Sequence, residues 1–342
     1  MIRVDGEEKS RGETRFTADI KIPGMMHGAI ARAPVSRGSI KRLIFSGDFD
    51  WSSVTIVTPD DIPGENVIHV IHDDMPCLAR DRVNYYGEPI ALVAAETQEL
   101  AREAVKNISA EVESEEPVAG IEELVELFKA SPEKLTVFKE YKIAKGDIEQ
   151  GFKESDNIVE GEYFTGLHEH IYLETQGMIA VPEENGKMRV LGSLQCPFYV
   201  RPAVATALGM KEEDVIVEQV QMGGAFGGKE DFPSHLGAHA ALLAFKSKRP
   251  VKIIFDRSED IRFTTKRHPS YVRHRTGVRR DGTLTAMEIE VLFDAGAYQT
   301  LTPVVLSRGI LHSSGAYRCP NVNIRAAALK SNMPPAGAFR GF

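Results

Sequence analysis

A glycine-rich stretch decides how this chain is interpreted: Gln221-Met222-Gly223-Gly224-Ala225-Phe226-Gly227-Gly228-Lys229-Glu230-Asp231. The alternating apolar run before it, 215–220, predicts a buried strand, and the apolar spacing over 235–245 predicts a helix after it. Glycines at a strand-to-helix turn let the backbone approach a ligand closely, and free N–H groups at the helix start favour an anion. The stretch is therefore a candidate cofactor loop.

The same spacing partly fits a nucleotide-binding P-loop, because Gly223, Gly228 and Lys229 occupy the positions of G-x-x-x-x-G-K-[ST]. Glu230 stands where that motif needs a hydroxyl for Mg²⁺, and its carboxylate would repel the phosphates. Phe226 suits a wall beside a flat ring better than a loop around a phosphate. Three interpretations stay open for the loop alone: a structural turn, a loop for a non-nucleotide cofactor, and a nucleotide-hydrolysing site.

The composition limits the function classes. With 342 residues, 42% of them hydrophobic, the chain is long enough for two domains. A formal net charge of -8 leaves no broad basic face, which argues against a nucleic-acid partner. No apolar run reaches the roughly 18 residues of a membrane span. The three isolated cysteines, Cys77, Cys196 and Cys319, form no C-x-x-C pair and indicate no disulfide framework, so a reducing cytoplasm fits best.

Strands mixed with amphipathic helices predict an α+β fold rather than a doubly wound parallel sheet. A buried strand over 89–95 and a helix capped by Thr97 form a β-α-β pattern, and a later hairpin turns at Arg280-Asp281-Gly282. A short helical pattern over 121–128 lies between Pro-containing turns. The predicted ranges are a first domain over 1–115, a connecting segment lying over the surface at 116–141, and a second domain over 142–342.

Four further features carry possible chemistry. His168-Glu169-His170 would place two imidazoles on one face of a strand, as metal ligands or as packing histidines. Glu174 lies among apolar residues, so it is either a hydrogen-bond hub or a catalytic acid. Gln195 ends a strand with an amide that both donates and accepts. Arg308 lies in an apolar run, which predicts a buried ion pair or a clamp for an anionic or carbonyl-bearing substrate.

Several stretches, in this order and spacing, together resemble the molybdenum-binding subunit of the xanthine dehydrogenase and aldehyde oxidase family. They are Tyr172-Leu173-Glu174, the loop from Gly223 to Glu230, Arg267-His268-Pro269, Gly296-Ala297-Tyr298, and Ala338-Phe339-Arg340-Gly341-Phe342. The resemblance covers nearly the whole chain. It implies a hammerhead-like domain followed by the first part of a molybdopterin-binding domain.

The resemblance implies a molybdenum-molybdopterin cofactor, in the cytosine dinucleotide form usual in bacterial members. Sulfur of the pterin, not protein side chains, coordinates the metal in this family. By position, Gln195, Phe226 and Arg340 would surround the molybdenum, and Gly224, Ala225 and Gly227 would complete the cofactor-binding loop. Ala225 replaces a glycine common in the family, a change that a backbone outside the left-handed region tolerates.

The family hydroxylates an electron-poor carbon with oxygen from water. Glu230 and Arg308 correspond to the substrate-orienting pair of its purine-oxidising members, and Phe342 corresponds to an aromatic that stacks on the heterocycle. An acid, a guanidinium and an aromatic plate suit a flat ring with nitrogens and carbonyls. The resemblance therefore favours a purine or xanthine-type heteroaromatic substrate, with an aldehyde as the alternative within the family.

Family members continue well beyond the segment that ends here at Phe342, and a Gly-x-Gly-Glu segment in that continuation supplies their general base. The chain is therefore expected to be one half of a catalytic subunit, inactive and without molybdenum by itself: either a chain cut after Phe342 or the product of a naturally split gene that a second polypeptide completes. Electrons would leave through a [2Fe-2S] subunit and an FAD subunit. A non-catalytic scaffold or assembly chain with the same fold is the alternative of a different class.

Overall fold

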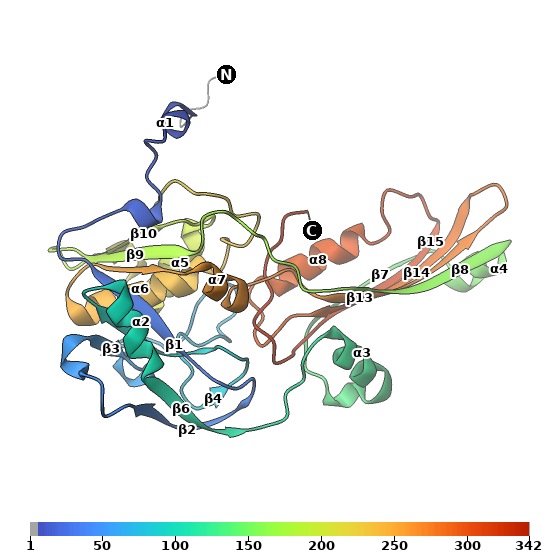
Figure 1. Cartoon of the computed structure of the whole chain (residues 1–342). Coiled ribbons are helices and arrows are strands. Elements are labelled where there is room, and N and C mark those ends of the chain that lie inside the picture. The colour runs from blue at the N-terminus through green and yellow to red at the C-terminus, as the bar shows by residue number, and fades with distance from the viewer. Residues whose placement is uncertain (1–5, 342) are drawn as a thin grey trace. The chain divides into compact units, whose positions relative to one another are not determined.

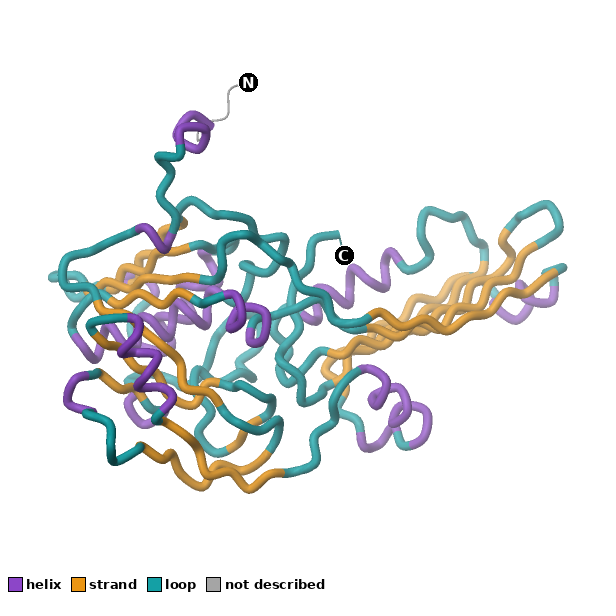
Figure 2. The backbone as a smooth tube through the Cα atoms, viewed as in Figure 1, coloured by secondary structure: helices purple, strands orange, loops and turns teal. Residues whose placement is uncertain are grey.

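The computed structural model describes residues 6–341, which form two compact units, each built on sheets of its own (Figure 1). The first unit combines the chain up to Glu115 with His170–Thr264. The second combines Glu116–Glu169 with the chain from Thr265 onward. Each unit is therefore assembled from two segments that are separate in the sequence. Mixed strands and helices confirm the predicted α+β class (Figure 2).

The first unit contains a seven-stranded sheet of order β11-β10-β9-β12-β1-β5-β3. Its strands are β1 (Met26–Arg32), β3 (Thr55–Val57), β5 (Pro89–Ala95), β9 (Gly177–Pro182), β10 (Met188–Gly192), β11 (Val215–Gln219) and β12 (Val251–Ile254). Strand β1 pairs in parallel with β12 and antiparallel with β5. This pairing joins both segments of the unit in one sheet, so the sequential ranges 1–115 and 142–342 differ from the compact units.

Helices cover both faces of this sheet. Long apolar stripes of α5 and α6 pack on one face, whereas α2 packs on the other with a small second sheet of order β4-β2-β6. The further elements of this unit are α1 (Gly6–Arg11), β2 (Gly38–Phe45), β4 (Arg82–Val83), α2 (Gln98–Lys106), β6 (Ile108–Ser114), α5 (Pro197–Leu208), α6 (Pro233–Ser247) and α7 (Arg257–Phe263), with 3-10 turns η1 (Thr17–Asp19), η2 (Trp51–Ser53), η3 (Pro59–Asp61) and η5 (Glu212–Asp214). Every residue of β5 is buried, which explains its unbroken apolar sequence.

The second unit is a five-stranded sheet of order β7-β15-β14-β13-β8. Its strands are β7 (Val137–Lys145), β8 (Asn157–Thr165), β13 (Ser270–Val278), β14 (Leu284–Asp294) and β15 (Asn321–Leu329), and its helical elements are α3 (Ile121–Ala130), η4 (Pro132–Lys134), α4 (Ile148–Lys153) and α8 (Thr302–His312). The predicted hairpin is β13 and β14, which pair antiparallel over their length. Helix α8 packs its apolar stripe on the side of the sheet that carries Ile289 and Ile324.

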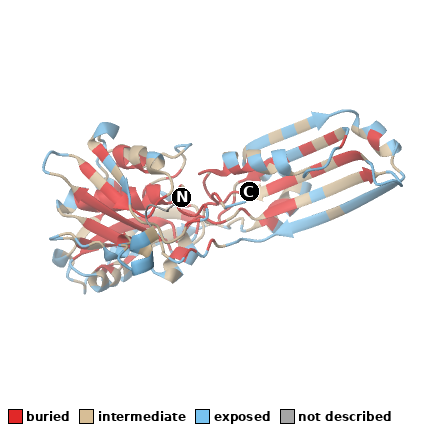
Figure 3. Ribbon diagram, turned by 90° about the horizontal axis from the view of Figure 1, so that it is seen from above, coloured by how far each residue is buried: buried red, intermediate tan, exposed pale blue. Residues whose placement is uncertain are grey.

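The segment 116–141 contributes to a core, although the sequence predicts a connection lying over the surface. Ile121, Leu124 and Val125 of α3 are buried against Tyr271 and Leu292 of the sheet. The spacing of the three apolar residues places them on one side of the helix, so a short helix next to turns can still cover part of a sheet. Figure 3 shows the buried residues along the strands of each unit.

Candidate functional site

The glycine loop, residues 221–231, connects β11 to α6 as predicted. Three of its residues have a positive φ: 98° at Gly224, 55° at Phe226 and 101° at Gly227. Phe226 is thus a bulky residue in the left-handed region, a strained conformation that the surrounding structure must impose. Ala225 does not have a positive φ, which is why an alanine is tolerated there.

The glycines are required because the loop lies directly on the segment 170–174. A Cβ added at Gly223 would come within 2.6 Å of the Glu174 Cβ, and one at Gly228 within 2.7 Å of the His170 Nδ1 and of the Tyr172 ring. Distances under 3 Å from such buried groups cannot be relieved without moving the backbone. The motif Tyr172-Leu173-Glu174 therefore belongs to the segment 170–174 on which the glycine loop packs; this segment is called the floor of the loop below.

Glu174 is the hydrogen-bond hub of this floor, as one of its two sequence interpretations predicts. Its Oε2 accepts hydrogen bonds from the Ser193 hydroxyl at 2.6 Å, the Gly223 N–H at 2.8 Å and the Lys229 ammonium at 3.1 Å. Its Oε1 accepts a hydrogen bond from the Thr17 N–H at 3.3 Å. Burial would raise the pKa of Glu174, but Lys229 and these donors outweigh burial and hold that pKa below its ordinary value.

Lys229 rules out the P-loop interpretation. Its side chain is 0% exposed, and its ammonium donates to the Glu174 backbone oxygen at 2.7 Å and to the Ser193 hydroxyl at 2.9 Å, in addition to the Glu174 carboxylate. A P-loop lysine instead reaches the phosphates of its ligand. From the sequence, Lys229 is only one position of an incomplete P-loop match. The sequence signal for its partner is Glu174, a carboxylate among apolar residues that needs a cation if it is buried.

Gln195 lies beside the glycine loop and is held by it. Its Oε1 accepts hydrogen bonds from the N–H groups of Gly227 at 3.0 Å and Lys229 at 3.3 Å, and its own N–H donates to the Lys229 oxygen at 2.7 Å. These contacts use the acceptor of the amide and leave its NH₂ group without an acceptor in the described chain. The N–H groups of Gly224, Ala225 and Phe226 likewise have no acceptor among residues 6–341.

Glu230 follows Lys229 and is half-buried. Burial raises the pKa of its carboxyl group, and that carboxyl has no hydrogen-bond or ion-pair partner within the described residues. Burial raises the pKa of the Cys196 thiol to about 11, and the nearby charge of Glu230 adds to this increase. The thiol of Cys196 is therefore protonated at neutral pH and unreactive.

Arg308 and Arg340 belong to the second unit, and the expectation of a buried ion pair for Arg308 is wrong. Arg308 is exposed on α8 because Val305, Leu306 and Ile310 form the buried stripe of that helix, and it makes no ion pair in the part of the chain that the structure describes. Arg340 is also exposed and lines a hollow of about 310 Å³ together with residues of α8. Phe342 lies outside the described residues.

The two histidines of the His168-Glu169-His170 stretch lie in different environments. His168 is exposed in an isolated bridge with Arg267, whereas His170 is buried and stacks on the Tyr172 ring. Within residues 6–341, no three His, Cys, Asp or Glu side chains are grouped as metal ligands. The surroundings of His170 therefore fit the packing role that is the alternative to ligation.

The unpaired donors of this site fit a cofactor that presents oxygen atoms. The Gln195 NH₂ group and the three consecutive N–H groups of the glycine loop offer hydrogen bonds from a backbone that carries almost no side-chain bulk. A metal held here would have to bring ligands of its own, because the described residues supply no ligand cluster. A metal bound through a pterin meets both conditions.

Comparison with known families then decides the class. A molybdopterin cofactor-binding domain matches residues 128–342, and the a/b hammerhead domain of aldehyde oxidase and xanthine dehydrogenase matches residues 11–116. The chain belongs to this family. The two matches confirm the predicted order of a hammerhead domain followed by a molybdopterin-binding domain.

Relatives in this family span the whole chain. It is 35% identical to a probable xanthine dehydrogenase subunit of Bacillus subtilis and 35% identical to the nicotinate dehydrogenase large molybdopterin subunit of Eubacterium barkeri, in both cases over 100% of its length. Among solved structures, the aldehyde oxidoreductase of Desulfovibrio gigas matches 99% of the chain with a TM-score of 0.90 and 26% identity. Quinoline 2-oxidoreductase of Pseudomonas putida matches 100% with a TM-score of 0.86 and 26% identity.

The family members differ in length from this chain. It spans 46% of the Bacillus subtilis relative, 80% of the Eubacterium barkeri subunit, 39% of the Desulfovibrio gigas chain and 45% of the Pseudomonas putida chain. No helix among residues 6–341 has both the length and the hydrophobicity needed to span a membrane.

Proposed function

We propose that the chain is the molybdopterin-binding part of a molybdenum hydroxylase that acts on an N-heteroaromatic substrate, with a purine or xanthine-type ring as the first candidate. The observation that carries this proposal is the carboxyl group of Glu230, half-buried next to the glycine loop and without a partner in the described chain. A carboxyl kept unpaired in such a place is available for a ligand group. Ring nitrogens and carbonyls of a heteroaromatic are suitable partners, because a carboxyl accepts when ionised and donates when protonated.

The remaining roles follow from the donors already described. Gln195 and the N–H groups of Gly224, Ala225 and Phe226, with Gly227 allowing close approach, would hold the oxygen-bearing part of the cofactor. When bound, the molybdenum-pterin group supplies the two-electron oxidation and takes the new oxygen from water. The dinucleotide form of the pterin is proposed to be the cytosine form.

Orientation of the substrate is assigned to four residues that the family resemblance singles out. Glu230 would bind one edge of the ring, Arg308 a carbonyl or anionic group, and Phe342 a ring face, while Arg340 would lie in the metal surroundings. The exposed guanidinium of Arg308, unpaired in the described residues, supports this assignment because it is free for a ligand. The general base is assigned to another part of the complete enzyme.

The names of relatives support a nitrogen heterocycle. Xanthine, nicotinate and quinoline, which appear in the names of three relatives, are all nitrogen heteroaromatics. An aldehyde is the alternative, because the Desulfovibrio gigas structure is an aldehyde oxidoreductase and a Cavia porcellus relative, at 36% identity, is an aldehyde oxidase.

The complete enzyme is proposed to contain further polypeptides. The relatives named above are longer, and we propose that the remainder of the molybdenum subunit completes the cofactor site while a [2Fe-2S] subunit and an FAD subunit carry out electron transfer. The three free thiols, Cys77, Cys196 and Cys319, support a location in the reducing cytoplasm. The chain purified alone should hold no molybdenum, since its cradle would be incomplete.

Co-expression with the remainder of the molybdenum subunit and with the two electron-transfer subunits tests the proposal. The purified complex should contain molybdenum and pterin and should oxidise a member of a panel of purines, nicotinate and aldehydes. Glu230→Gln should reduce kcat/KM for the heterocycle by about 100-fold or more, as expected for loss of one charged hydrogen bond to the substrate, and should leave aldehyde turnover nearly unchanged. Equal losses on both substrate classes would reject the substrate assignment, and a metal-free complex would reject the hydroxylase.

A further inference from the structure

Strand β8 is an edge strand with unusual exposure. In the described chain it pairs with β13 alone, so one side of its backbone has no neighbouring strand. None of its nine residues is buried, and Figure 3 shows a strand exposed along its length at the edge of the sheet. Four of its side chains are large and apolar, with exposed fractions of 43%, 61%, 58% and 49% for Ile158, Val159, Tyr163 and Phe164.

This edge lacks most of the features that normally prevent strand addition. Natural edges are blunted by charged side chains, especially lysines, by prolines, by bulges or by a covering helix. The sequence of β8 contains no lysine and no proline, its only charged residues are Glu160 and Glu162, and its pairing with β13 runs without a register shift from Asn157 to Thr165. A regular, apolar edge of this length is a template for a further strand.

The opposite edge of the same sheet provides an internal comparison. Strand β7 carries Lys139, Lys142 and Lys145, its pairing with β15 has a register shift near Ala328, and α8 packs along it. One edge of the sheet is therefore protected and the other is not. If exposed edges were simply tolerated in this protein, the β7 edge would not need its lysines, its register shift and its covering helix.

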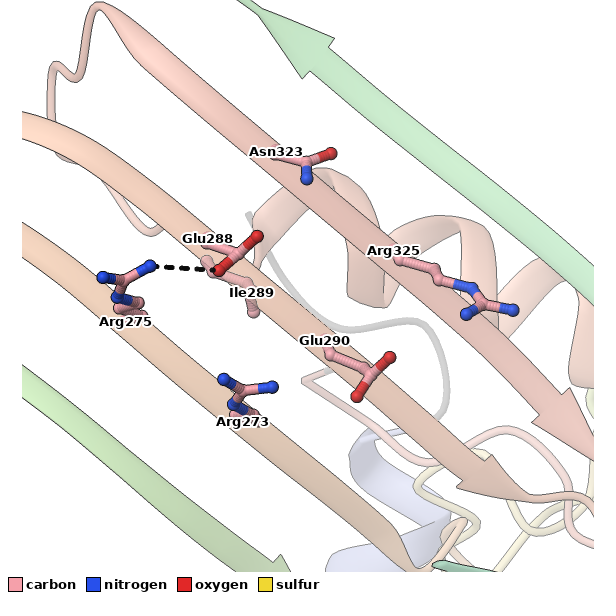
Figure 4. A pocket seen from close by; sticks show the side chains of 7 residues that line it. All are labelled: Arg273, Arg275, Glu288, Ile289, Glu290, Asn323 and Arg325. Atoms are coloured by element: carbon pink, nitrogen blue, oxygen red, sulfur yellow. Dashed lines mark ion pairs between the residues drawn. The ribbon is translucent and has the colours of Figure 1, made fainter. Parts of the chain in front are cut away.

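The charged face of the sheet restricts what can pair with β8. Figure 4 shows polar side chains standing on one face of β13, β14 and β15, around a hollow of about 230 Å³. This hollow is lined by Arg273, Arg275, Glu288, Ile289, Glu290, Asn323 and Arg325. The strand register extends the same face to Glu160 and Glu162 of β8, opposite Arg275 and Arg273. Glu160 pairs with Arg275 at 2.6 Å and Glu162 with Lys129 at 3.2 Å, yet their side chains stay 55% and 49% exposed.

Self-pairing of two β8 strands conflicts with these charges. An antiparallel pair of two copies centred on Gly161 would place each Glu160 opposite Glu162 of the other copy. Like charges directly opposite each other destabilise a strand pair. A complementary strand would instead carry cationic side chains next to the two glutamates and apolar side chains next to Val159 and Tyr163, which lie on the other face.

We infer that β8 receives a sixth strand from the remainder of the molybdenum subunit, and that this strand alternates apolar and cationic residues. The inference rests on the proposed function, because that function requires the remainder of the subunit. The remainder is the occupant with enough additional chain, since this chain spans 46% of the Bacillus subtilis relative and 39% of the Desulfovibrio gigas chain. It would be anchored through main-chain hydrogen bonds at β8.

Hydrogen exchange of this chain alone and of its complex with the co-expressed remainder of the molybdenum subunit tests the inference. Amides of 157–165 should exchange at least about 10-fold more slowly in the complex, because an added strand protects main-chain N–H groups, whereas amides of β7 should not change. Val159→Lys and Tyr163→Lys should each weaken association by about 10-fold or more. Val137→Lys, at an exposed position of β7, is the matched control and should leave association unchanged.

Each outcome separates the inference from the proposed function. A complex that binds molybdenum but leaves β8 unprotected overturns the inference and keeps the function. A complex that protects β8 but contains no molybdenum or pterin supports the inference and overturns the function. Failure to form any complex, or a self-dimer of this chain that Val159→Lys disrupts, overturns the inference.

Discussion

The floor of the glycine loop gives the sharpest prediction about stability. Glu174→Ala removes the carboxylate that pairs with the fully buried Lys229 ammonium and leaves the Gly223 N–H without its acceptor. The cation keeps the Ser193 hydroxyl at 2.9 Å, a backbone oxygen at 2.7 Å and the Tyr172 ring, whose centroid lies 4.7 Å away, but no anionic partner among these contacts. Removing one partner of a buried ion pair costs about 3–5 kcal/mol, a large part of the roughly 5–15 kcal/mol that stabilises a typical domain.

A matched surface pair in the same unit provides the control. Arg42 and Glu111 pair at 2.7 Å, but their side chains are 72% and 52% exposed, so Glu111→Ala should cost only about 0–1 kcal/mol. Urea unfolding followed by the fluorescence of Trp51 measures both variants, because this sole tryptophan lies in the same unit. The loss for Glu174→Ala should exceed the control by about 2 kcal/mol or more.

A double variant tests the cause of that loss. Glu174→Leu with Lys229→Met replaces the pair by apolar side chains of similar length and should recover about 2 kcal/mol or more relative to Glu174→Ala, since no buried charge remains. Two results would refute the reasoning: a cost for Glu174→Ala no larger than for Glu111→Ala, or a double variant whose loss equals the sum of the losses of its two single variants.

Three further predictions concern titration and exposure. Burial lowers the pKa of His235 from 6.5 to about 3 and of His239 to about 4, so their contribution to stability is complete above pH 6.5 and is lost as the pH falls toward 4. The loss should reach roughly 2 kcal/mol per histidine at pH 5, and an unfolding free energy that stays constant from pH 7 to pH 5 would contradict it. Burial raises the pKa of Glu230 in the folded protein above its pKa in the unfolded chain. The buried carboxylate therefore destabilises the fold at pH values above the folded-state pKa, and this effect is absent at pH values below the unfolded-state pKa. Glu230→Gln should therefore raise the melting temperature at pH 7.5 by about 1 °C or more and have little effect near pH 4, and a lower melting temperature at pH 7.5 would show that Glu230 has a structural partner. Arg308→Ala should change the melting temperature by no more than about 1 °C because this guanidinium is exposed, and a large loss would restore the buried ion pair as its role.

The local elements could be predicted from the sequence because their signals are local. The glycine loop between a strand and a helix, the Thr97 cap and the hairpin of β13 and β14 all follow from periodicity and turn residues over short windows. The family follows from the order of several weak motifs. That resemblance also predicts that Gln195 and the glycine loop are neighbours, and their hydrogen bonds confirm it.

The remaining features depend on contacts between distant segments. The pairing of β1 with β12 assembles the first unit from separate stretches, which no short window reveals. The apolar neighbours of Arg308 predict its burial, but a helix can expose one position in an apolar run when its stripe faces the other way. Lys229 resembles a P-loop lysine in sequence, and only the position of Glu174 beneath the loop shows its actual partner.

Metal and pterin analysis of the purified complex tests the central claim most directly. The wild-type complex should contain stoichiometric molybdenum and pterin. Gly227→Ala, at a φ of 101° within the loop, should abolish both, whereas Gly186→Ala, at a φ of 81° in a hairpin turn with open space around it, should retain both. A folded complex that lacks the metal, or equal retention in the two variants, would contradict the assignment of the glycine loop as the cofactor site.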